Sequence, residues 1–319
     1  MSNVIRGQSV PRALFLGMRG NFSHPPLLAL LENGVEVCAI VLPARDHYRE
    51  QPAIRQLVPP PQSRSLLPVI NSSLHTSIAR IAWQRHIPVW EVSRMSDPET
   101  ITLFSQYQPD IMCVACFSLY IPRVILDIPR FGCLNVHPSL LPANRGPDPL
   151  FWTFHEGSQE TGVTIHVMDE GMDTGPIVAQ EKITVPDAIS YAHFEEQCAQ
   201  LGGKLLARSV WQLYYGNALL TPQDESRSSY LPMPTNEDFM VPASDWEARR
   251  VFNFIRGLAS RGEPIIILSE GRFIRATDAI SYSHENTNND EINLENSVGN
   301  AIRVKCKNGW VEYRIQIVD

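Results

Sequence analysis

The chain has 319 residues, of which 44% are hydrophobic and 19% are charged. A hydrophobic share of that size can bury a sizeable core and excludes a wholly disordered chain, and the length suits about two domains. There are 27 lysines and arginines against 34 aspartates and glutamates, a formal net charge of −7, which excludes a basic field over the whole chain and leaves a local basic patch open.

The cysteines indicate a reducing compartment. Six cysteines in a chain of this length are too sparse for a disulfide scaffold, so we expect a cytoplasmic protein. Cys113 and Cys116 lie three apart in the apolar run 111–117, where strand residues at that spacing point to opposite faces. We therefore expect two buried, reduced thiols and no metal site. No export signal and no apolar stretch of about 18 residues is seen, so no membrane segment is expected.

Strands alternate with helices over the first 140 residues. The expected strands are 13–16, 35–42, 88–92, 110–117 and 133–137, and the expected helices are 25–31, 74–85 and 98–107. Residues 43–72 carry six prolines and are interpreted as a long irregular segment. Because the strands are solid apolar runs separated by helices, the pattern predicts an α/β fold with a Rossmann-like, mostly parallel sheet covered on both faces.

The remaining chain predicts a change of architecture. Strands at 161–168 and 177–185 and a helix at 191–216 complete a first domain at 1–220, and a polar, proline-rich linker follows at 221–241. The segment 242–319 predicts a helix at 246–257, a polar loop at 281–297, and short strands at 264–268, 272–279, 301–305 and 311–317. Short strands without alternating helices are typical of a small β-barrel domain.

Two polar residues at the end of one strand suggest chemistry. Asn135 and His137 are two apart on the strand 133–137, so their side chains share a face at its carboxyl end, where open α/β sheets bind ligands. An amide and an imidazole placed there can stabilise a developing oxyanion. Asp173 follows His137 by 36 residues in a glycine-containing turn, and a neighbouring strand could return it to the same edge to orient the imidazole.

Each of these residues also has a structural interpretation. An Asn at a strand end often caps a turn, a His in a loop is often structural, and an Asp between glycines often serves the turn itself. Spacing alone leaves both interpretations open.

A series of motifs carries a family resemblance. Residues 134–142 read Leu-Asn-Val-His-Pro-Ser-Leu-Leu-Pro, and they are followed by Arg145-Gly146, by Thr-Gly-Val-Thr-Ile at 161–165, and by Met-Asp-Glu-Gly-Met-Asp-Thr-Gly at 168–175. In this order and spacing they resemble the folate-dependent formyltransferase family over about residues 12–216. The two-domain layout is closest to that of methionyl-tRNA formyltransferases, whose small C-terminal domain is an OB-like barrel.

The resemblance implies a reaction and roles for three residues. The family moves a formyl group from 10-formyltetrahydrofolate to a primary amine, without a metal and without a covalent enzyme intermediate. Asn135 and His137 would stabilise the oxyanion of the tetrahedral intermediate, and Asp173 would position His137 and relay protons. We call Asn135, His137 and Asp173 the catalytic trio.

The resemblance also implies a folate pocket built from three segments. Its residues would be Phe117, Ser118, Leu119, Tyr120 and Ile121; Ser139, Leu140, Leu141 and Pro142; and Val167, Met168 and Asp169. Many relatives carry glycine where Ser118 stands, a departure that would narrow or re-angle the pocket.

The acceptor is left open by the sequence. Relatives have a loop similar to residues 17–24 near the acceptor entrance, and Arg19, His24, Arg145 and Asp148 are our candidate acceptor-side residues. The run Arg-Gly-Pro-Asp-Pro at 145–149 departs from the usual Arg-Gly-Ala-Ala-Pro. Residues 240–319 hold ten Lys or Arg and eleven Asp or Glu, which gives no net basic bias for tRNA. Arginines 249, 250, 256 and 261 could still form a basic face. Initiator methionyl-tRNA and an amino sugar nucleotide or other small amine therefore both remain candidates.

Two other functions are compatible with the same residues. The trio could direct water onto the formyl group, which would make the protein a 10-formyltetrahydrofolate hydrolase. A non-catalytic folate- or nucleic-acid-binding protein could also keep the fold. The loop 17–24 after the first strand could bind phosphate, but it lacks the Gly-x-Gly-x-x-Gly pattern, so a dinucleotide fold is disfavoured.

Overall fold

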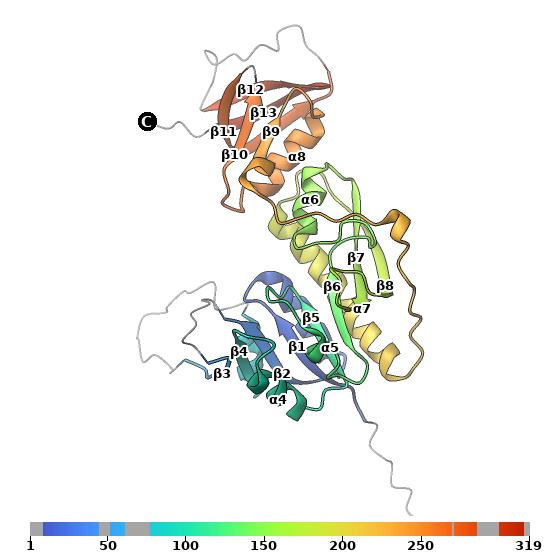
Figure 1. Cartoon of the computed structure of the whole chain (residues 1–319). Helices are drawn as coiled ribbons and strands as arrows, with labels where there is room; N and C mark the ends of the chain where they lie inside the picture. The colour runs from blue at the N-terminus through green and yellow to red at the C-terminus, as the bar shows by residue number, and fades with distance from the viewer. Residues whose placement is uncertain (1–8, 45–51, 61–76, 270, 286–299, 316–319) are drawn as a thin grey trace, which may run out of the picture. The chain divides into compact units, whose positions relative to one another are not determined.

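The chain forms two compact units, each assembled from separate stretches of sequence (Figure 1). The computed structural model describes residues 9–44, 52–60, 77–269, 271–285 and 300–315. The first unit comprises Met1–Pro142, Val163–Glu181 and Glu196–Ser228. The second comprises Ala143–Gly162, Lys182–Glu195 and Ser229–Asp319.

An eight-stranded sheet runs in the order β3-β4-β2-β1-β5-β6-β7-β8. Its strands are β1 Arg12–Gly17, β2 Glu36–Pro43, β3 Ile54–Leu57, β4 Val89–Val92, β5 Ile111–Ala115, β6 Cys133–His137, β7 Glu160–Val167 and β8 Ile177–Thr184. The pairs among β4, β2, β1, β5 and β6 are parallel, whereas β3 pairs with β4 and β7 with β6 in antiparallel fashion. The prediction of a mostly parallel α/β sheet is confirmed.

Helices cover both faces of this sheet. They are α1 His24–Glu32, α3 Ile78–Gln84, α4 Pro98–Gln106, α5 Arg123–Leu126 and α7 Tyr191–Tyr214. From α4 and α5, Phe104 and Ile125 join the buried cluster that includes Val114 of β5. On the opposite face, Gly202 of α7 lies so close to the sheet that an added Cβ would come within 2.5 Å of Val136. Among the residues described, no helix is both long and apolar enough to cross a membrane.

The proline-rich segment contains a strand that the sequence did not predict. β3, at Ile54–Leu57, pairs antiparallel with β4, so the prediction of a wholly irregular segment at 43–72 is wrong there. Prolines stand on either side of β3, at 52 and from 59 to 61, and leave its four residues free to pair as an edge strand. Residues 45–51 and 61–76 lie outside the described part of the chain.

The prediction of two buried cysteines is wrong for Cys116. The strand β5 ends at Ala115, before the predicted end at residue 117, and Cys116 adopts φ 59° with its side chain exposed. Cys113 is buried as expected, and burial raises the pKa of its thiol.

The second unit contains a five-stranded sheet in the order β12-β13-β11-β10-β9. Its elements are α6 Pro149–His155, β9 Met240–Pro242, α8 Ala248–Leu258, β10 Ile265–Ser269, β11 Arg272–Ser283, β12 Ala301–Cys306 and β13 Gly309–Ile315. Phe254 of α8, Ile267 of β10 and Tyr313 of β13 are fully buried. The strand β11 continues to Ser283, so the predicted polar loop begins later than residue 281.

Candidate active site

β6 and β7 place four polar side chains on one face of the sheet. Asn135 and His137 share a face of β6 because they are two residues apart. In the antiparallel register, Asn135 lies directly opposite His166 and His137 directly opposite Thr164. Paired residues point to the same side of a sheet, so the two strands together present an amide, two imidazoles and a hydroxyl.

Asp173 reaches this face from the loop between β7 and β8. The loop leaves β7 beside Leu134, because β7 runs antiparallel to β6, and then folds back over the sheet. Asp169 organises the loop, since its Oδ1 accepts hydrogen bonds from Gly171 N at 3.1 Å and Thr174 Oγ1 at 2.6 Å. Asp173 itself has φ 56°, in the left-handed region.

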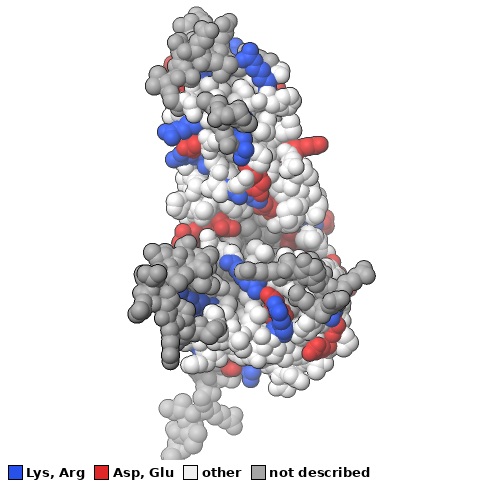
Figure 2. Space-filling view, turned by 90° about the vertical axis from the view of Figure 1, so that its left-hand side faces the viewer, with Lys and Arg blue, Asp and Glu red and all other residues white. Residues whose placement is uncertain are grey.

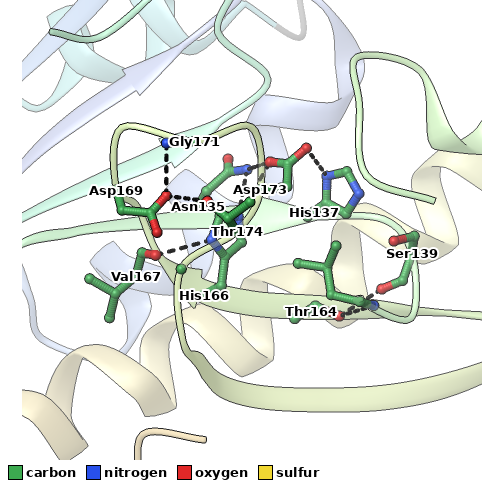
Figure 3. A network of polar contacts seen from close by, with 12 residues as sticks. Asn135, His137, Ser139, Thr164, His166, Val167, Asp169, Gly171, Asp173 and Thr174 are labelled. Atoms are coloured by element: carbon green, nitrogen blue, oxygen red, sulfur yellow. Dashed lines mark hydrogen bonds and ion pairs between the residues drawn. The ribbon is translucent and has the colours of Figure 1, made fainter. Parts of the chain in front are cut away.

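The carboxylate of Asp173 lies between two imidazoles (Figure 3). Its Oδ2 is 3.6 Å from His137 Nδ1, and its Oδ1 is 3.5 Å from His166 Nε2. Asn135 Nδ2 lies 3.4 Å from Asp173 Oδ1 and 3.2 Å from His166 Nε2. The side chains of His137, His166 and Asp173 are 5%, 2% and 9% exposed, so these contacts form away from bulk water. The structure thus brings all three residues of the trio together.

This arrangement suits attack on a carbonyl group. A buried carboxylate beside His137 Nδ1 holds the ring in place, and an imidazole N–H or an amide N–H can donate to a developing oxyanion. The carboxylate and imidazole can also take up a proton from an attacking nucleophile. Within the part of the chain described, no group of three or more His, Cys, Asp or Glu side chains is placed to hold a metal ion.

The segment after β6 is fixed by the hydroxyl of Thr164. Thr164 Oγ1 donates to Ser139 O at 2.7 Å and accepts from Leu141 N at 3.3 Å. Gln180 of β8 donates from Nε2 to Leu141 O at 2.9 Å, and the Leu141–Pro142 peptide bond is cis. The predicted folate-binding residues 139–142 therefore have a defined path beside His137.

The other two predicted folate-binding segments meet on one hydrophobic cluster. Phe117, Leu119 and Met168 pack, partly buried, against the cluster to which Ile121 belongs. Ser118 and Tyr120 alternate with them and are exposed. The structure thus brings residues 117–121 and Met168 to one side of the sheet.

The predicted acceptor-side residues fall in both units. In the first unit, Arg19 forms an ion pair with buried Glu91, and His24 begins α1 with its pKa lowered by burial, against which Glu196 acts to raise it. In the second unit, Arg145 is buried. Asp148 caps α6 by accepting from Phe151 N at 3.2 Å, and it pairs with Arg261 at 2.8 Å.

Sequence reasoning missed four residues of this region: His166, Thr164, Gln180 and Gln223. A signal existed for two of them, because Thr164 and His166 are polar residues at a spacing of two among Val163, Ile165 and Val167. Such alternation predicts a polar face on one side of a strand. No local pattern marks Gln223, since its side chain donates hydrogen bonds to the main-chain oxygens of Asp173 and Gly175, about fifty residues away.

Comparisons of sequence identify relatives of this chain. Residues 30–210 match the model of a family described as formyl transferase. A methionyl-tRNA formyltransferase from Syntrophus aciditrophicus is 38% identical over 247 residues, which cover 77% of this chain and 72% of that protein.

Comparisons of structure find the same fold in solved proteins. The N-formyltransferase from Helicobacter canadensis, in complex with folinic acid and dTDP-3-aminofucose, has a TM-score of 0.63 at 14% identity, over 97% of this chain and all of that one. HypX from Aquifex aeolicus, in complex with tetrahydrofolic acid, has a TM-score of 0.59 at 16% identity, over 96% of this chain and 44% of that longer one. At such identities the likeness is one of fold. The chain belongs to the formyl transferase family, and it is an enzyme of folate-dependent formyl transfer.

Proposed function

We propose that this enzyme transfers a formyl group from 10-formyltetrahydrofolate to a primary amine. The observation that carries the proposal is the meeting of Asn135, His137 and Asp173 on one face at the end of β6. These are the groups that formyl transfer requires, since the attacked oxygen gains negative charge and the attacking nitrogen must lose a proton.

Each member of the trio has a role in this scheme. The amine attacks the formyl carbon, and Asn135 Nδ2 and His137 donate hydrogen bonds to the resulting oxyanion. Asp173, 3.6 Å from His137 Nδ1, stabilises that ring as a cation and receives the proton that the amine gives up. The bond from the formyl carbon to N10 then breaks as the proton passes to N10, so one C–N bond has formed and one has broken.

We propose that residues 117–121, 139–142 and 167–169 bind the folate donor. Two observations support this assignment: Phe117, Leu119 and Met168 share a hydrophobic cluster, and Thr164 and Gln180 fix the segment that contains Leu141. Ser118, exposed in its loop, is the position at which the pocket would differ from relatives that carry glycine.

For the acceptor we propose initiator methionyl-tRNA, supported by relatives that bear the name methionyl-tRNA formyltransferase at 31–38% identity. Arg19, His24, Arg145 and Asp148 are the proposed acceptor-side residues. A small amine such as an amino sugar nucleotide is the second candidate, and a specific observation favours it. Arg249, Arg256 and Arg261 each form an ion pair with an aspartate, at 2.6, 2.7 and 2.8 Å. Because a carboxylate balances the charge of each of them, these arginines do not add up to the basic face that a tRNA would favour.

The distribution of charge on the surface also supports a small amine as the acceptor. On the face shown in Figure 2, basic and acidic side chains are interspersed among neutral ones. A broad basic face, which a tRNA would favour, is not seen on that side of the described residues.

We propose a catalytic domain at 1–220, a linker at 221–241 and a C-terminal domain at 242–319. The five-stranded order β12-β13-β11-β10-β9 supports a small β-domain, for which we propose an OB-like barrel. A cytoplasmic location stays a prediction from the cysteine content.

Incubation of the full chain with 10-formyltetrahydrofolate tests the proposal. Charged initiator tRNA and a panel of amino sugar nucleotides serve as separate acceptors, and formylated product is measured by mass spectrometry. We expect transfer to one of them, and we expect loss of that activity in His137→Ala. Donor consumption at the same rate without any amine would instead assign a hydrolase, and a fully active His137→Ala would contradict the role of the trio.

A further inference from the structure

His166 is buried, yet both of its ring nitrogens have partners. Nδ1 lies 3.1 Å from the main-chain oxygen of Val167. A carbonyl oxygen only accepts, so Nδ1 must carry the hydrogen of this bond. In the neutral ring Nε2 then has a lone pair, and it lies 3.2 Å from Asn135 Nδ2, which donates to it.

This contact sets the orientation of the Asn135 amide. Nδ2 carries two hydrogens, and His166 Nε2 accepts one of them. The other is directed to Asp173 Oδ1 at 3.4 Å, a long and therefore weak bond that an oxyanion can replace. With the amide reversed, its oxygen would face both the imidazole lone pair and the carboxylate, which is repulsive.

Protonation of His166 would remove this arrangement. Nε2–H would donate to Asp173 Oδ1, 3.5 Å away, and would oppose the N–H of Asn135 instead of accepting from it. Among the described residues, the titratable groups that face the ring include Asp173, from the loop after β7, and His137 of β6, whose ring centre is 6.4 Å away. The charge on His166 thus decides whether Asn135 presents a donor or is displaced.

We propose that His166 is a positioning residue for formyl transfer, which in its neutral form holds the Asn135 amide as a donor for the oxyanion. The inference rests on the proposed function, in which Asn135 donates to that oxyanion. It predicts that loss of the acceptor at this position lowers turnover, since a donor set in place beforehand is what stabilises the charge.

Two substitutions separate this role from simple packing. His166→Leu removes the acceptor, and we expect kcat to fall about 10- to 100-fold with little change in the KM of the folate donor. His166→Gln supplies an amide oxygen near the position of Nε2 that can accept from Asn135. We therefore expect it to restore most of kcat. Ile165→Val, a buried residue on the other face of β7, is the matched control and should keep the wild-type kcat.

Several outcomes would overturn the inference. Wild-type kcat in His166→Leu, or no recovery of kcat in His166→Gln, would do so while the wild-type enzyme still transfers formyl groups. Absence of transfer by the wild-type enzyme would instead contradict the proposed function. The tautomer of His166, measured from its ring nitrogen chemical shifts in the full chain, is independent of activity. We expect Nδ1–H, and Nε2–H would refute the inference even if His166→Leu failed to fold.

Discussion

The side chain of Gln223 holds the main chain at Asp173, fifty residues earlier in the sequence. Its Nε2 donates to Asp173 O at 2.8 Å and to Gly175 O at 2.7 Å. The two bonds span the stretch of the loop that carries the carboxylate to His137.

We expect Gln223→Ala to lower kcat about tenfold, because the carboxylate would no longer be held at one position. Gln223→Glu should be worse, because a carboxylate would face two carbonyl oxygens. Gln200, exposed on α7 and bonded to Glu196 at 3.3 Å, provides a control that should not change kcat when replaced by alanine. Steady-state kinetics of the three variants decide this, and equal rates in Gln223→Glu and the wild type would contradict it.

Asp173→Asn should lower kcat by about 10²- to 10⁴-fold without loss of the fold. Asparagine has the same shape and tolerates the left-handed region in which φ at this position is 56°. It lacks the negative charge that stabilises protonated His137. We expect an unfolding temperature close to that of the wild type, measured by circular dichroism, together with the kinetic loss. A variant that kept wild-type turnover would remove Asp173 from the mechanism.

Gly175→Ala should disrupt the same loop by a steric route. An added Cβ would lie 1.8 Å from Val167 O, a distance that no carbon can occupy, so the loop must move. We expect lower thermal stability together with lost activity. Gly20→Ala is the control, since nothing lies within 4 Å of its Cβ position, and it should behave as the wild type.

Glu91 makes stability depend on pH in the acid range. Its side chain is 4% exposed, Oε1 accepts from Arg19 at 2.6 Å, and Oε2 accepts from Arg55 Nε at 2.8 Å. Burial raises the pKa of Glu91, but the bonds from Arg19 and Arg55 outweigh it and leave the pKa below the ordinary value of 4.5. The stabilisation is therefore complete above pH 4.5 and is lost as the pH falls through the lower folded value.

Urea unfolding at several pH values measures this contribution. At pH 7 we expect Glu91→Gln to cost about 1–3 kcal/mol, less than for a fully buried pair because Arg55 is half exposed. Its stability should also fall less steeply in acid than that of the wild type. Glu36→Gln, at a pair with 50% exposure and a separation of 3.7 Å, should change little. Parallel pH profiles for Glu91→Gln and the wild type would contradict the assignment.

The site was predictable where the signal was local. β6 was predicted to the residue, because Gly132, with φ 78°, and Pro138 bound an apolar run whose alternation fixes the face of Asn135 and His137. The meeting of Asp173 with His137 was expected from the family resemblance, which the order of the motifs carries. The spacing of the residues alone left it open.

The contacts that the sequence did not predict depend on pairing between residues far apart in the chain. His166 reads as one residue of a buried strand until the antiparallel register of β7 sets it opposite Asn135. The ion-pair partners of the arginines could not be predicted either, because Arg249 and Asp187, for example, lie 62 residues apart. Composition gives charge totals, but only the fold says which charges cancel.

The pairing of β6 with β7 has a consequence for how such an enzyme can diverge. Because neighbouring strand residues face opposite sides, a slip of one position would swing Thr164 and His166 away and bring Val163 and Ile165 in their place. Insertion or deletion of a single residue inside β7 should thus abolish catalysis, whereas the loops around it can vary in length. Lineages that keep this chemistry must inherit the two strands as one indivisible block.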